Sequence, residues 1–103
     1  MRQHLLFAQL ACALKSTLHI SSFAESGLLE ISLNGEVVIA GTGEHISEVD
    51  SDLAILLRWS IKAKPGTNYR ITVLEPASAE FSHVGLIDKT GFATGNKKLQ
   101  IIS

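Results

Sequence analysis

The chain has 103 residues, carries 9 Lys and Arg against 10 Asp and Glu, and has a formal net charge of −1. This balance, with no basic stripe, argues against a nucleic-acid-binding protein, and the length fits one domain that buries its own core. Cys12 is the only cysteine, which excludes an internal disulfide framework and a zinc site made of cysteines.

The first sixteen residues are mainly apolar and allow two interpretations. Residues 2–16 contain no Gly, Pro or β-branched residue, which favours a helix. Such a helix is apolar on most of its sides, so we expect a second copy of the chain to cover it in a dimer. The predicted interface residues are Leu5, Leu6, Phe7, Leu10 and Leu14.

The alternative is a signal peptide, because small residues at 11–13 follow an apolar run. A retained segment would suit a cytoplasmic protein, and a cleaved one would suit a secreted or periplasmic protein. In either case the run is too short to cross a bilayer as a helix, so we expect no integral membrane span.

From Thr17 onward the apolar pattern becomes that of short strands. We expect a weak strand at 17–23 and another at 45–49. Between them, Asn34-Gly35 predicts a type I′ hairpin turn. With a two-residue turn, position 31 opposes 38 and position 29 opposes 40, which predicts one shared apolar face. The residues of that face are Leu29, Ile31, Val38 and Ala40.

The clearest alternation runs from Leu53 to Lys64 and predicts a strand with one dry face and one wet face. Pro65-Gly66 suits the two central positions of a type II turn, and a second strand is expected at 68–74. We therefore predict a hairpin made of these two strands. The side chains expected to point inward are Leu53, Ile55, Leu57, Trp59, Ile61 and Ala63, followed by Tyr69, Ile71 and Val73.

Two more strands are expected near the C-terminus, at 81–87 and 98–102, joined by the glycine-rich segments 89–91 and 93–96. In the second of these strands, Leu99 and Ile101 should point inward. Seven or eight short strands predict a mainly β fold, an antiparallel two-sheet sandwich over residues 17–103 behind the short N-terminal helix. Trp59 and Tyr69 make the pattern similar to immunoglobulin or fibronectin type III cores. A small β-barrel is the alternative.

The candidate chemistry is sparse, and no catalytic constellation or cofactor motif occurs. An acidic stretch after residue 43 offers oxygen ligands, but it lacks the spacing of a calcium loop. We expect no metal site, and the weak candidates are Glu44, His45, Glu48, Asp50 and Asp52.

The sequence thus favours a non-enzymatic interaction domain that self-associates through its N-terminal helix, with no cofactor. On that hypothesis, deleting residues 1–15 should leave a folded monomer. A secreted or periplasmic glycan-binding domain is the second hypothesis. A small enzyme is the third, and it requires the acidic stretch to converge with His19 or His83.

Overall fold

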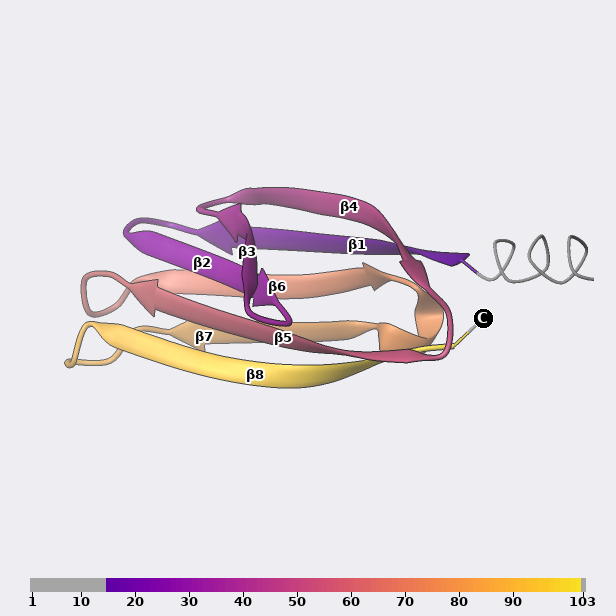
Figure 1. The fold of residues 1–103 in the computed structure, drawn as a ribbon. Helices are drawn as coiled ribbons and strands as arrows, with labels where there is room; N and C mark the ends of the chain where they lie inside the picture. The colour runs from indigo at the N-terminus through magenta and orange to yellow at the C-terminus, as the bar shows by residue number, and fades with distance from the viewer. Residues whose placement is uncertain (1–14, 103) are drawn as a thin grey trace, which may run out of the picture.

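A computed structural model describes residues 15–102, which form two four-stranded antiparallel sheets (Figure 1). The strands are β1 (Lys15–Ala24), β2 (Leu28–Leu33), β3 (Glu36–Ala40), β4 (Gly43–Asp50), β5 (Leu53–Lys62), β6 (Asn68–Glu75), β7 (Phe81–Leu86) and β8 (Phe92–Ile101). We call the sheet of order β4-β1-β6-β7 sheet A and the sheet of order β3-β2-β5-β8 sheet B. Neither sheet closes on itself, so the mainly β, two-sheet prediction is confirmed and the barrel alternative is wrong.

The core lies between the two sheets and consists of every second side chain along the strands. The predicted inward positions of β5 and β6 are confirmed, except that Leu53 remains partly exposed and Ala63 is half-buried. Alternation places apolar residues on the dry face, and their burial supplies the main stabilising free energy. The largest fully buried side chains are Leu18, Ile20, Ile71 and Val73 in sheet A, Leu29, Ile31, Leu57, Ile61, Leu99 and Ile101 in sheet B, and Ile87 just after β7.

The predicted hairpin around Pro65-Gly66 is wrong, because β5 and β6 belong to different sheets. The turn itself forms: Gly66 has a φ of 89°, and the Thr67 N–H donates to the Lys64 carbonyl at 3.1 Å. The Gly66 N–H then donates to the Ile87 carbonyl, which directs the chain into sheet A. The turn therefore connects the two layers, and β5 pairs with β2 and β8 instead.

The hairpin at Asn34-Gly35 is confirmed, but its register differs from the prediction. Asn34 and Gly35 have φ values of 49° and 88°, as a type I′ turn requires. The register shifts between residues 31 and 32 of β2, so Ile31 pairs with Ile39 and not with Val38. The extra residue reverses which side chains of β3 face the core. Ile39 is consequently the buried residue of this strand.

The segment 93–96, expected to be a loop, lies inside β8, which begins at Phe92. Gly95 is paired with Trp59 of β5, and a Cβ at position 95 would clash with the indole ring. The glycine is therefore needed for a close approach inside a strand and does not mark a turn.

The predicted N-terminal helix lies outside the described residues, except for its last two positions. Lys15 and Ser16 belong to β1 and pair with Asp50 and Val49. The first strand therefore starts two residues earlier than the sequence pattern indicated. No helix within residues 15–102 is long and apolar enough to cross a membrane.

Candidate functional site

The acidic stretch, which held the weak metal candidates, is divided between the two faces of β4 and the turn that follows. Glu44, Glu48 and Asp50 point outward, whereas His45 lies on the half-buried face. Asp52 is in the turn, with a φ of 63°. Side chains that point in opposite directions cannot share one ion. Nowhere in residues 15–102 do three or more His, Cys, Asp or Glu side chains gather in a way that could hold a metal.

Two of these carboxylates contact basic side chains of β1. Glu44 Oε1 lies 2.9 Å from His19 Nε2, and Asp50 Oδ1 lies 2.6 Å from Lys15 Nζ. On its other side, His19 Nδ1 is 3.9 Å from Glu75 Oε1 of β6. These surface contacts join the outer face of sheet A across three strands. Exposed ion pairs of this kind stabilise a fold by about 1 kcal/mol or less each.

His83 lies at the other side of sheet A from the acidic stretch. It sits in β7 within an aromatic cluster, with ring centroids 4.8 Å from Trp59 and 5.5 Å from Tyr69. The Tyr69 hydroxyl is 3.1 Å from His83 Nε2. Because β4 and β7 are the two outer strands of the sheet, only His19 meets the acidic stretch, and it meets Glu44 alone. The convergence that an enzyme requires is not formed by these residues.

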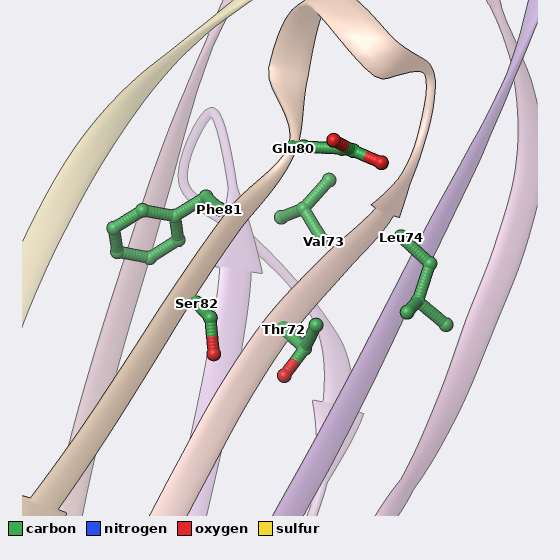
Figure 2. Close-up of a pocket in the computed structure, with 6 residues that line it drawn as sticks. All are labelled: Thr72, Val73, Leu74, Glu80, Phe81 and Ser82. Atoms are coloured by element: carbon green, nitrogen blue, oxygen red, sulfur yellow. The ribbon is translucent and has the colours of Figure 1, made fainter.

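The surface of residues 15–102 is hollowed at the end of β6 and β7 and again on sheet B. The larger hollow, about 370 Å³, sits at the end of β6 and β7, where Val73 and Leu74 line it beside Glu80 (Figure 2). Figure 2 shows the Phe81 ring on the far side of β7 from Leu74. The smaller hollow, about 200 Å³, lies on the outer face of sheet B and is lined by Glu30, Ser32, Val37, Arg58, Trp59, Ser60 and Thr94.

Asp88, in the loop between β7 and β8, has a carboxyl group with a shifted pKa. The Thr90 hydroxyl and the Thr90 N–H both donate to Asp88 Oδ1, and these hydrogen bonds lower the pKa of Asp88. Asp88 is fully exposed, and Thr90 also donates to the Phe92 carbonyl. The arrangement shapes the loop that leads into β8.

The strand β7 is an open edge of sheet A within residues 15–102. The Ile87 N–H donates to the Thr67 carbonyl at 2.9 Å, on the β6 side. Residues of an antiparallel ladder alternate in direction, so Leu86, Val84 and Ser82 turn their N–H and C=O groups to the open edge. The side chains of Val84 and Leu86 are also 71% and 65% exposed. Apolar side chains and backbone groups that have no partner within residues 15–102 therefore coincide on β7.

The opposite edge of sheet A is β4. Its backbone groups alternate in direction as those of β7 do, but its exposed face carries carboxylates. On β1, the Glu25 N–H bonds toward β6 and the Ala24 N–H bonds toward Thr42, so alternate residues of β1 bond to β4. By the same alternation, Glu44, Ile46 and Glu48 turn their backbone groups to the open edge. Ile46 is 62% exposed between the two carboxylates.

Sequence reasoning predicted the strand at 81–87 but did not identify Val84 or Leu86 as surface residues. The available signal was a run of seven residues, 81–87, without Lys, Arg, Asp, Glu or Pro. The predicted interface residues Leu5, Leu6, Phe7, Leu10 and Leu14 lie outside the described residues.

No family model, curated protein or solved structure matches this chain.

Proposed function

We propose that this chain is a non-enzymatic interaction domain that binds further copies of itself. The observation that carries the proposal is the edge of β7, where Val84 and Leu86 are largely exposed beside backbone groups without partners among the described residues. Open strand edges of this kind pair with other strands unless charges, bulges or proline prevent it. The edge therefore has both the hydrogen-bonding groups and the apolar surface for a protein contact.

The other hypotheses have less support in the described residues. Of the catalytic candidates, only His19 and Glu44 are in contact, and the hollow on sheet B offers polar groups without a deep cavity for a glycan. The dimer helix with Leu5, Leu6, Phe7, Leu10 and Leu14 remains a prediction, as does the likeness to immunoglobulin or fibronectin cores. Self-association does not depend on that helix if the β7 edge supplies the contact.

Sedimentation equilibrium of the full chain at rising concentrations tests the proposal. We expect an average mass that increases with concentration above the 11.1 kDa of one chain. Backbone pairing with a small apolar contact predicts a reversible association, since interfaces well below about 1,000 Å² are usually weak. A mass of one chain at every concentration would show that the domain does not self-associate.

A further inference from the structure

The four edge strands lie in two groups, one at each side of the sandwich (Figure 1). On one side, β3 contacts β4, and Gly43 lies next to Ile39. On the other side, β7 and β8 are neighbours, because Lys97 of β8 lies over the Phe81 ring of β7 at 5.7 Å. Each side therefore presents one edge of sheet A and one edge of sheet B.

The two sides carry opposite charges. Strands β3 and β4 contain the carboxylates Glu36, Glu44, Glu48 and Asp50 and have no Lys or Arg. Strands β7 and β8 contain Lys97 and Lys98 and have no Asp or Glu. Arg70 of β6 pairs with Val84 and adds a further positive charge behind the β7 edge. The strands on the β4 side are thus acidic and those on the β7 side are basic, with Asp50 paired to Lys15 and with Glu80 and Asp88 just outside β7.

This separation of charge determines which edges can meet. Two β7 edges brought together by a two-fold axis would place the basic side of one copy against the basic side of the other. Two β4 edges would oppose their carboxylates in the same way. Like charges across an interface are unfavourable, whereas an acidic side against a basic side is favourable. The complement of the β7 edge is therefore the β4 edge of a second copy.

Strand direction is compatible with this arrangement. Successive strands in the order β4-β1-β6-β7 are antiparallel, so β4 and β7 run in opposite directions. A second copy that is translated sideways from the first, without rotation, therefore places its β4 antiparallel to β7. The contact joins two different surfaces and leaves a free edge at each end, so it can repeat.

We propose that β7 of one copy pairs with β4 of the next and that the sandwiches join side by side through a continuous sheet A. This inference rests on the self-association proposed above and specifies its surfaces. In the register that matches the side chains best, Leu86 lies opposite the second copy's Ile46, and Val84 lies opposite its Glu48. Arg70, Val84 and that Glu48 then follow one row across the outer face, with opposite charges flanking an apolar side chain.

Two proline variants, one for each edge, test the arrangement. Val84→Pro and Ile46→Pro each remove an N–H that points away from the sheet, so neither breaks a bond within sheet A. Each variant alone keeps one working edge and should sediment as a single chain. In an equimolar mixture, β7 of the Ile46→Pro chain can still pair with β4 of the Val84→Pro chain. The mixture should therefore form a complex of two chains and nothing larger, whereas the unmodified chain should grow beyond two.

The other outcomes each contradict part of the account. If Ile46→Pro alone still associates, β7 pairs with itself or another surface is used. The β7–β4 arrangement is then wrong, although self-association stands. If the mixture stays monomeric, the arrangement is also wrong. An unmodified chain that is monomeric throughout would instead overturn the proposed function.

A second pair of variants covers the case in which a proline chain does not fold. Val84→Glu should oppose the second copy's Glu48 and weaken the association by about tenfold, or roughly 1.4 kcal/mol. Glu48→Lys should weaken it to a similar degree. A chain carrying both changes should recover most of the loss, because the carboxylate introduced on β7 would then oppose the ammonium group introduced on β4 of the next copy. Additive losses in the double variant would rule out this register.

Discussion

Two glycines inside strands make room for large aromatic side chains of the core. Gly85 of β7 pairs with Tyr69, Gly95 of β8 pairs with Trp59, and in each case the aromatic ring covers its glycine. A Cβ at either position would meet the ring in place of open space. The rings lie flat because their partners have no side chain, and His83 packs between them.

We predict that Gly85→Ala and Gly95→Ala each lower the free energy of unfolding by about 1–3 kcal/mol, because a buried ring must move. The measurement is chemical denaturation monitored by tryptophan fluorescence. Gly43→Ala is the matched control in a strand, since its Cβ would meet only Ile39, at an ordinary 3.8 Å. If all three variants are equally stable, the rings do not require these glycines.

This glycine–aromatic pairing could not be predicted from the sequence. Burial of Trp59 and Tyr69 follows from strand alternation, which the sequence displays directly. Their glycine partners depend on the register between strands, and that is set by contacts between distant residues. Gly95 in particular was expected to be in a loop, because glycine within a strand resembles glycine in a turn when only local pattern is available.

At the scale of elements, turn chemistry was predictable and strand partners were not. Asn34-Gly35 and Pro65-Gly66 both form the turns that their residues favour, with Gly35 and Gly66 at positive φ. One turn joins neighbouring strands, while the other joins opposite sheets. The turn residues are alike in both cases, and β5 pairs with β8 along ten residues. The residues near a turn do not indicate which distant strand will pair with β5.

The tip of the β2–β3 hairpin supports an element-scale prediction. The Leu56 N–H donates to Asn34 Oδ1 at 2.9 Å, and the Asn34 N–H donates to the Leu56 carbonyl at 2.9 Å. Asn34→Ala loses the side-chain acceptor and keeps a residue at positive φ, so we expect a loss of about 1–2 kcal/mol. Asn34→Asp keeps an acceptor oxygen and should lose less. Thermal unfolding of both variants is the measurement, and equal losses would contradict the role of this bond.

On the scale of the whole molecule, the candidate surface follows from topology. Residues 44–50 and 81–86 are ordinary strands in the sequence, and only the sheet order shows that both are edges. The acidic stretch first suggested metal ligands. In the structure it instead makes one side of the sandwich negative, while the Lys97–Lys98 pair makes the opposite side positive. The structural role of these residues therefore depends on where their strands lie in the sheet.

In the proposed assembly, the open edges of β7 and β4 become paired when copies of the chain meet. Amide hydrogen exchange of the full chain, followed residue by residue in dilute and in concentrated solution, tests it most directly. We predict that the amides of Ser82, Val84 and Leu86 on β7, and of Ile46 and Glu48 on β4, exchange more slowly as concentration rises. Amides within the sheets should be unaffected. Equal exchange at both concentrations for these edge amides would contradict the account.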